Sequence, residues 1–111
     1  MKTKVYISGK VTGDPDYRKK FAKAERRLKE MGYDPLNPVK GEKDGKPWEY
    51  YLRRDIKKLC GCDAVLLLPD WAQSKGARLE RLVASRLGIK VWRLYGDGKI
   101  LVVEWKNGKE V

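Results

Sequence analysis

The chain has 111 residues, with 26 Lys and Arg against 15 Asp and Glu and a formal net charge of +11. This length suits one domain with a modest core. Neither a signal peptide nor an apolar run near the roughly 20 residues of a membrane span is present, so we expect a soluble, cytoplasmic protein without a membrane partner. The excess of positive charge favours partners that carry phosphate. Alternatively, it reflects only a soluble or heat-adapted surface.

Histidine is absent from the sequence, and this restricts the chemistry more than the charge does. Its absence removes the commonest general base, the commonest metal ligand and every Ser-His or Cys-His nucleophile pair. The only cysteines, Cys60 and Cys62, lack the spacing of a zinc site, and we interpret them as small core residues. Any catalysis must use Asp, Glu, Tyr, Lys or Cys, and we expect neither a metal nor a cofactor.

The predicted elements begin with a β-branched strand at Lys4–Ser8. Asp14 as N-cap and Pro15 at the first helical position then open a helix, which Gly32 caps at its other end. The apolar residues of this helix recur every three or four positions: Tyr17, Phe21, Ala24, Leu28 and Met31. A brief strand at 33–36 and a polar loop follow.

The second half of the chain continues the alternation. A helix is expected at Trp48–Leu59, then a strand at Ala64–Leu68, a helix at Gly76–Leu87 and a strand at Ile89–Trp92. The second helix should bury Tyr51, Leu52, Ile56 and Leu59. A glycine-bearing turn within residues 91–105 predicts a β-hairpin at the end.

This order of elements predicts a three-layer, Rossmann-like (flavodoxin-like) α/β fold, in which a parallel sheet has helices on both faces and a C-terminal β-hairpin is added. The right-handed crossover rule limits how the sheet can be wound. The chain contains no internal repeat, low-complexity segment or linker. We therefore expect one domain over residues 1–111, with an α/β core at 1–92 and a hairpin extension at 93–111.

The loops that follow parallel strands meet at one edge of the sheet, and several polar residues fall there. They are Tyr6, Ser8, Gly9, Lys10, Asn37, the loop from Asp70 through Ser74 to Gly76, and Glu80 one turn into the next helix. Asp55 can reach the same edge. Gly76 and Ala84, four positions on either side of Glu80, leave its carboxylate room to meet a ligand. Taken singly, Tyr6 is typical of a core and Glu80 of a solvated helix, but together these residues favour carboxylate chemistry.

Four segments of the chain occur in a recognisable order: Val5-Tyr6-Ile7-Ser8-Gly9-Lys10, Arg54-Asp55-Ile56, Cys62-Asp63-Ala64-Val65 and Ser74-Lys75-Gly76-Ala77-Arg78-Leu79-Glu80. In this order they resemble the nucleoside 2-deoxyribosyltransferase-like superfamily. Within it, the likeness is greatest to the DUF4406 family of short bacterial and phage proteins. The resemblance covers about residues 4–92 and leaves the terminal hairpin outside.

The resemblance implies a role for several residues. Glu80 would be the nucleophile, Tyr6 would orient or polarise it, and Asp55 would handle protons on the leaving base. Ser74 would hydrogen-bond the sugar or phosphate, because the related deoxynucleoside-monophosphate hydrolases have serine where the transferases have aspartate. The further substrate-binding candidates are Ser8, Gly9, Lys10, Asn37, Asp70 and Gly76.

These residue types suit cleavage of an N-glycosidic bond. A carboxylate stabilises or traps the oxocarbenium-like sugar and an acid protonates the base, so neither histidine nor metal is required. We expect nearby Lys and Arg side chains to keep Glu80 ionised at neutral pH.

The expected activity is therefore cleavage or transfer on deoxynucleosides or their 5′-monophosphates, and Ser74 and the net charge favour nucleotides. A non-catalytic nucleotide-binding or sensing protein on the same fold is the alternative. Nucleic-acid binding is a third hypothesis, with four aromatic residues available to stack bases: Trp48, Tyr50, Tyr51 and Trp71. We expect those aromatics to pack in the core or at an interface instead. The family likeness also implies a homo-oligomer, a dimer or larger.

Overall fold

The structure, a computed structural model, describes residues 2–42, 45–103, 105–106 and 109–110. Its centre is a five-stranded sheet with the order β2-β1-β3-β4-β5. The strands in this order are β2 (Asp34–Leu36), β1 (Lys4–Ser8), β3 (Ala64–Leu67), β4 (Lys90–Leu94) and β5 (Ile100–Val103). The first four are parallel, and β5 is antiparallel to β4.

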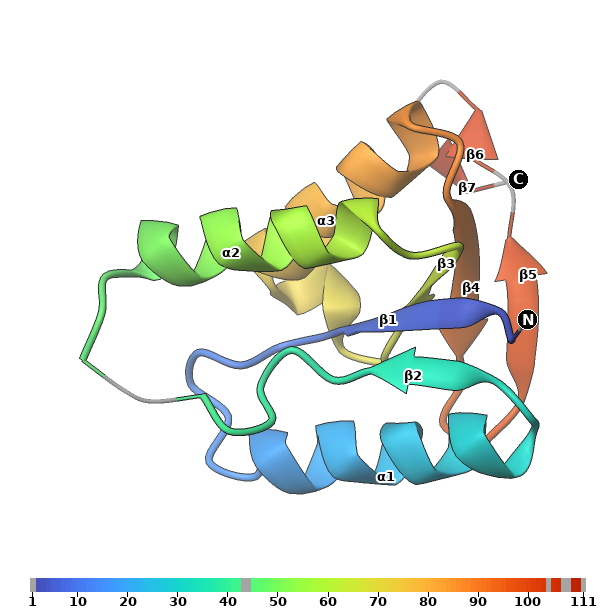
Figure 1. Ribbon diagram of the computed structural model, residues 1–111, viewed down its shortest axis with the longest axis horizontal. Helices are drawn as coiled ribbons and strands as arrows, with labels where there is room; N and C mark the ends of the chain where they lie inside the picture. Colours follow the sequence, from blue (N-terminus) through green and yellow to red (C-terminus); the bar gives the residue numbers. More distant parts are fainter. Residues whose placement is uncertain (1, 43–44, 104, 107–108, 111) are drawn as a thin grey trace.

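Helices cover both faces of this sheet. They are α1 (Tyr17–Glu30), α2 (Trp48–Cys60), α3 (Lys75–Arg86) and the short 3₁₀ helix η1 (Trp71–Gln73). Figure 1 shows α1 on one face and α2 and α3 together on the other. The predicted three-layer α/β fold with a C-terminal hairpin is confirmed. Position 104, which the predicted hairpin included, lies outside the described residues, and two short strands beyond it pair with each other, β6 (Trp105–Lys106) and β7 (Lys109–Glu110).

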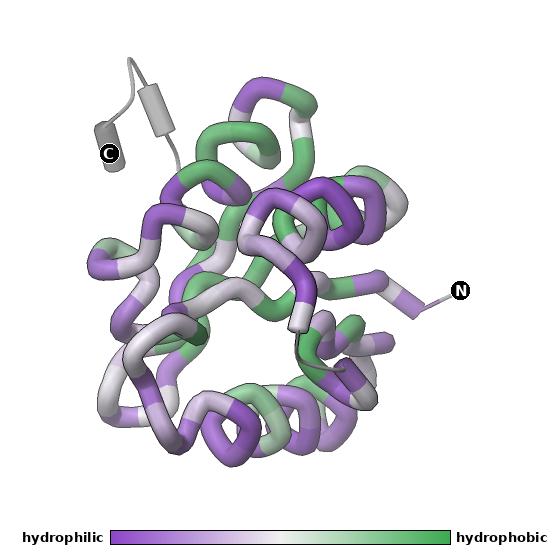
Figure 2. Tube along the Cα trace, turned by 90° about the vertical axis from the view of Figure 1, so that its left-hand side faces the viewer, coloured by the Kyte–Doolittle hydropathy of each residue, from purple (hydrophilic) through white to green (hydrophobic). Residues whose placement is uncertain are grey.

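The side chains of β1 alternate between two separate cores, as the period of two in a strand requires. Val5 and Ile7 pack with Phe21 of α1, whereas Tyr6 packs on the opposite face with Ala77 of α3. Figure 2 shows hydrophobic residues along the central strands and hydrophilic ones on the outer turns of the helices. Because Ser8 follows Tyr6 by two positions, the two hydroxyl side chains of β1 both face α3.

The start of α1 differs from the prediction. Asp16, not Asp14, is the N-cap residue, because Asp14 uses Oδ1 to accept the Asp16 amide at 2.9 Å in a turn before the helix. At the other end Met31 is the C-cap and Gly32 follows with φ +89°, a conformation that glycine adopts without strain. Met31 is 42% exposed and so lies outside the buried stripe, which comprises Phe21, Ala24 and Leu28.

Predictions about buried side chains are also wrong in and just after α2. Cys62 is buried, but Cys60 is exposed, because it lies on the outer side of the last turn of α2. Leu59 is the only residue of α2 that is fully buried. Tyr51, Leu52 and Ile56, which were predicted to be buried, are half-buried. Tyr51 and Leu52 face a cavity next to α2.

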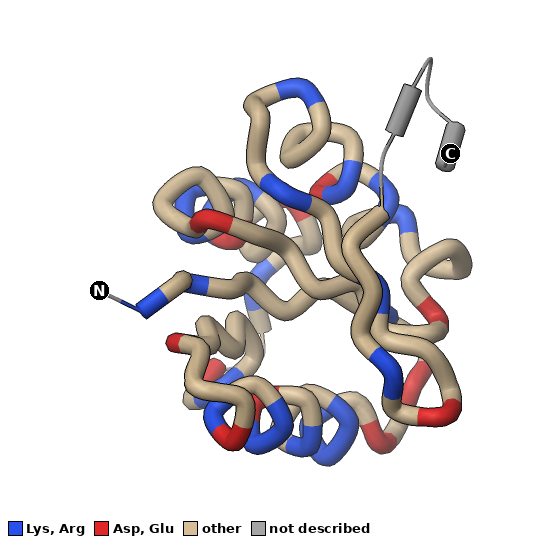
Figure 3. Tube along the Cα trace, turned by 90° about the vertical axis from the view of Figure 1, so that its right-hand side faces the viewer, with Lys and Arg blue, Asp and Glu red and all other residues tan. Residues whose placement is uncertain are grey.

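The strand β5 is an edge of the sheet. Its central residues Leu101 and Val102 are 52% and 68% exposed. Figure 3 shows Lys and Arg along α1 and on several other elements. Among the described residues, none of the helices combines the length and the apolar composition that a membrane crossing requires.

Candidate active site

Glu80 lies on the sheet-facing side of α3. Ser74 is the N-cap of this helix, and its Oγ accepts the Ala77 amide at 3.1 Å. One turn further, Glu80 is only 6% exposed, and both of its carboxyl oxygens accept hydrogen bonds from β1. The Tyr6 hydroxyl donates to Oε2 and the Ser8 hydroxyl donates to Oε1 at 2.7 Å. Two elements that are far apart in the chain therefore hold one buried acid.

Burial raises the pKa of Glu80 to about 7, because an ionised carboxylate loses its hydration there. The hydrogen bonds from Tyr6 and Ser8 lower this pKa, and the negative charge of Asp55 raises it further. The expectation that Lys and Arg keep Glu80 ionised is therefore wrong, since the groups that favour its charged form are two hydroxyls. Burial and the charge of Glu80 also raise the pKa of Tyr6, which stays a hydrogen-bond donor.

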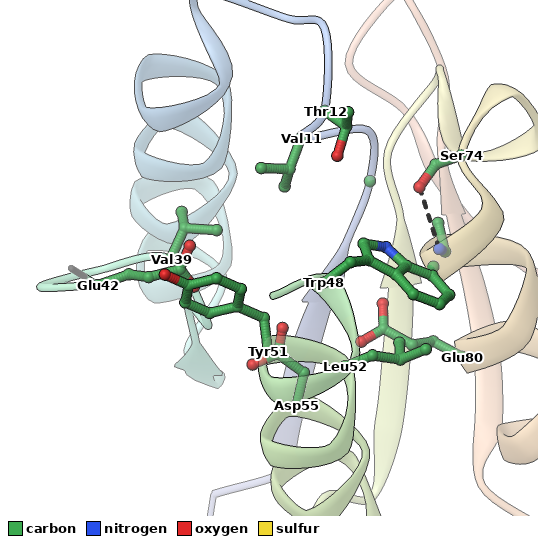
Figure 4. A pocket seen from close by; sticks show the side chains of 13 residues that line it. Val11, Thr12, Val39, Glu42, Trp48, Tyr51, Leu52, Asp55, Ser74 and Glu80 are labelled. Atoms are coloured by element: carbon green, nitrogen blue, oxygen red, sulfur yellow. Dashed lines mark hydrogen bonds between the residues drawn. The ribbon is translucent and has the colours of Figure 1, made fainter. Parts of the chain in front are cut away.

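Glu80 and Asp55 both line a cavity of about 110 Å³ between α2, α3 and the loop after β1. The other lining residues are Gly9, Val11, Thr12, Val39, Glu42, Trp48, Tyr51, Leu52, Ser74, Gly76 and Ala77. Figure 4 shows the two carboxyl groups directed from facing helices toward the space between them, with Trp48 above Glu80. Trp48 is 46% exposed and forms part of the rim.

Asp55 is held by its neighbour in the chain. Arg54 donates from both Nε and Nη2 to Oδ1 of Asp55, at 3.1 and 2.9 Å. Burial raises the pKa of Asp55, while the bonds and charge of Arg54 lower it. The same Nη2 donates to Glu42 Oε2 at 2.5 Å, and these two carboxylates raise the pKa of Arg54 in spite of its partial burial.

The chain is similar to a known protein family and to solved structures. Residues 3–93 match the family model described as a domain of unknown function, DUF4406. The chain belongs to the DUF4406 family. This match confirms the resemblance that the sequence predicted. A comparison with curated proteins found no match.

Two solved structures have the fold of this DUF4406 protein. One is a 2-deoxyribosyltransferase from the psychrotolerant bacterium Bacillus psychrosaccharolyticus, with a TM-score of 0.67 and 18% identity over 89% of this chain and 77% of that one. The other is a conserved protein from Enterococcus faecalis V583, with a TM-score of 0.65 and 23% identity. Here the match covers 87% of this chain but only 65% of the other. At these identities the likeness shows a shared fold.

Half of the ten predicted site residues of the DUF4406 protein lie on the wall of the cavity. Its lining includes five of them: Glu80, Asp55, Gly9, Ser74 and Gly76. Tyr6 and Ser8 contact it indirectly, through Glu80. Lys10 lies next to it, in an adjoining hollow that shares Thr12, Trp48, Ser74 and Gly76 with the cavity.

Asn37 and Asp70 are not brought to the cavity. The amide of Asn37 donates to Glu25 at 3.1 Å and its carbonyl oxygen accepts the Val39 amide at 3.1 Å, so the side chain folds its own loop. Asp70 accepts the Lys10 amide at 3.1 Å and pairs with the ammonium group of Lys20. Both residues thus hold loops in place at the edge of the sheet.

Three charged or aromatic side chains of the cavity were not predicted as parts of the site: Glu42, Trp48 and Tyr51. Glu42 lies in a loop without periodicity, and nothing in the sequence places it opposite Arg54. Trp48 and Tyr51 were interpreted only as aromatics for stacking or packing, although the start of a helix at the carboxyl edge of the sheet is a signal for a binding site. Among the described residues, no group of three or more Asp, Glu or Cys side chains is arranged to hold a metal ion.

Proposed function

We propose that this DUF4406 protein cleaves or transfers at the N-glycosidic bond of 2′-deoxynucleosides or their 5′-monophosphates, with Glu80 as the nucleophile. One observation carries the proposal: a buried carboxyl group that two hydroxyls hold, on the wall of a cavity that a second carboxyl group also lines. The fold shared with a 2-deoxyribosyltransferase supports it.

In the proposed reaction the Glu80 carboxylate attacks C1′ of the sugar while the bond from C1′ to the base nitrogen breaks. The electron pair of that bond goes to the base, which takes a proton from the Asp55 carboxyl group. This leaves a sugar ester on Glu80 and an ionised Asp55. Water or a second base then attacks C1′, Asp55 takes up its proton, and Glu80 leaves as a carboxylate.

The hydrogen bonds from Tyr6 and Ser8 serve this reaction in two ways. They fix the plane of the Glu80 carboxyl group, and they stabilise its negative charge before attack and after release. Only ionised Glu80 attacks and only protonated Asp55 donates, so turnover depends on the pKa of both groups. That of Glu80 is raised to about 7, that of Asp55 is also raised from its ordinary value, and turnover should fall at alkaline pH as Asp55 loses its proton.

A phosphate on the 5′ carbon fits the surroundings of the cavity. The Ser74 Oγ accepts one hydrogen bond from the helix and keeps its own proton to donate. The adjoining hollow carries the side chains of Lys10 and Lys75, and the net charge of +11 attracts anions. These features favour nucleotides over nucleosides.

One observation favours a second candidate, a nucleotide-binding protein without turnover. A carboxyl group with a pKa of about 7 is about half protonated at neutral pH, and a protonated carboxyl group is a poor nucleophile. Binding would then proceed in the same cavity without chemistry at C1′.

One experiment separates these candidates. The protein is incubated with the four 2′-deoxynucleosides and their 5′-monophosphates, with and without an acceptor base, from pH 6 to 9, and free base is measured by chromatography. Release by the wild type and by E49Q, which alters an exposed glutamate of α2, but not by E80Q would support the enzyme. Calorimetric binding with the ligand recovered intact would support the second candidate, and neither release nor binding would reject both.

A further inference from the structure

The way Arg54 is bound indicates how the second carboxyl group of the cavity would work. We propose that Arg54 is the positioning residue of this site, holding Oδ1 of Asp55 so that Oδ2 is the atom that carries the proton to the leaving base and takes one back. This inference rests on the proposed function, which it extends to a residue outside the lining of the cavity.

The two oxygens of Asp55 have different surroundings. Oδ1 accepts two hydrogen bonds from the guanidinium group of Arg54, at 3.1 and 2.9 Å. Among the described residues, no donor bonds to Oδ2. A proton is disfavoured on an oxygen that already faces two cationic donors. It therefore resides on Oδ2, the oxygen left available to a ligand in the cavity.

Arg54 is itself fixed, so it can orient Asp55 without moving. Its Nη2 also donates to Glu42 Oε2 at 2.5 Å and to the carbonyl oxygen of Pro38 at 3.3 Å, and its Cζ lies 5.3 Å from the centre of the Tyr51 ring. The Glu42 side chain is only 9% exposed. A buried carboxylate is destabilising without a positively charged partner, which here is Arg54. A planar guanidinium group can serve several acceptors at once, which an ammonium group cannot do with the same geometry.

A second arginine holds the same loop without a hydrogen bond to Asp55. Arg18 of α1 donates to the carbonyl oxygens of Val39 and Glu42, at 2.8 and 3.0 Å. The loop 38–42 is therefore tied to α1 by Arg18 and to α2 by Arg54, and Arg54 alone of the two bonds to Asp55. Substitutions of Arg18 and Arg54 can therefore distinguish a loss of support for loop 38–42 from a loss of orientation of Asp55.

The charged groups around Asp55 set the direction of the expected change. Arg54 and Lys58 lower the pKa of Asp55, and Glu42 raises it. Asp55 in turn raises the pKa of Glu80 and of Tyr6. Loss of the Arg54 guanidinium group should therefore raise the pKa of Asp55, because a neighbouring positive charge favours the carboxylate.

The first test needs no turnover. Carboxyl carbon shifts of the full chain are followed by NMR against pH in the wild type, R54Q and R18Q, and D55N assigns the Asp55 signal. We expect R54Q to raise the pKa of Asp55 and R18Q to leave it in place. Equal behaviour of R54Q and R18Q would overturn the proposal. If R54Q does not fold, R54K is measured instead. Its lysine keeps the positive charge but not the two hydrogen bonds to Oδ1, so the carboxyl carbon shift of Asp55 should differ from that of the wild type. An unchanged shift would overturn the proposal.

The second test uses base release from the deoxynucleotide that the wild type accepts best. R54Q should lose on the order of 10²-fold in kcat with little change in KM, since a positioned acid contributes about 10²–10⁴-fold. The fold-loss of kcat in R18Q should be at least about ten times smaller than the fold-loss in R54Q. The double variant R54Q/D55N should be no slower than D55N, because both changes disable the same group. Additive losses, or equal losses in R18Q and R54Q, would contradict the proposal.

The two tests fail in different ways. If the wild type releases no base, the proposed function fails, while the NMR titration still decides whether Arg54 holds Asp55. If base is released and R54Q behaves as R18Q does in both tests, the proposed function stands and the role of Arg54 is rejected.

Discussion

Replacing Glu80 with glutamine should stabilise the protein at neutral and alkaline pH while it abolishes turnover. The pKa of this acid is raised from 4.5 to about 7 in the folded state, so the folded protein holds a proton that the unfolded chain has already released between these values. The free energy of unfolding of the wild type therefore falls as the pH rises from 4.5 to 7. At about 1.36 kcal/mol per pH unit, the total decrease is about 3.4 kcal/mol.

Glutamine does not ionise and has nearly the same shape, so E80Q escapes this decrease. Urea unfolding of both proteins at pH 5, 6, 7 and 8 should show the stability difference growing by about 2.5 kcal/mol in favour of E80Q, mostly below pH 7. E49Q, at an exposed position, should show no such growth. A difference between E80Q and the wild type that is constant from pH 5 to 8 would refute the reasoning, since Glu80 would then be ionised throughout.

Three further substitutions test the surroundings of the cavity. K20M removes an ammonium group that donates to the Lys10 carbonyl, Asp14 and Asp70. The substitution should lower the free energy of unfolding by about 1–3 kcal/mol and speed hydrogen exchange at residues 10–14. Unchanged, slow exchange there would contradict this prediction. G9A places a Cβ 2.7 Å from Leu68 Cδ1 and should cost about 1–3 kcal/mol; an unchanged Tm would speak against it. G76A meets only ordinary contacts, the nearest at 3.8 Å, so stability should hold while calorimetry shows weaker nucleotide binding; full affinity would mean that the ligand lies elsewhere.

The fold was predictable because its signals are local. The alternation along β1 places Tyr6 and Ser8 on one face, and the spacing along α3 turns Glu80 toward the same face. Strand and helix order then brings these elements together without knowledge of any distance. The raised pKa of Glu80 was not predictable in this way, because the loss of hydration depends on how completely α3 packs on the sheet.

The site was harder to predict in its loops. Asn37 and Asp70 follow strands, as ligand-binding residues often do, but their side chains hold their own loops. Glu42 lies on the cavity because it pairs with Arg54 twelve positions along the chain, and no periodic pattern marks such a pair. Polar loop residues are placed by partners that the sequence alone does not identify.

The distance along the chain between the partners of Glu80 has a consequence for biosynthesis. Tyr6 and Glu80 are 74 positions apart in a chain of 111, so the first strand leaves the ribosome well before the acid that it will bind. The hydroxyl groups and the carboxyl group can meet only after this long loop closes, which is a slow kind of event in folding. A ligand that occupies the finished cavity would therefore select chains whose folding is complete, and would protect them from proteases.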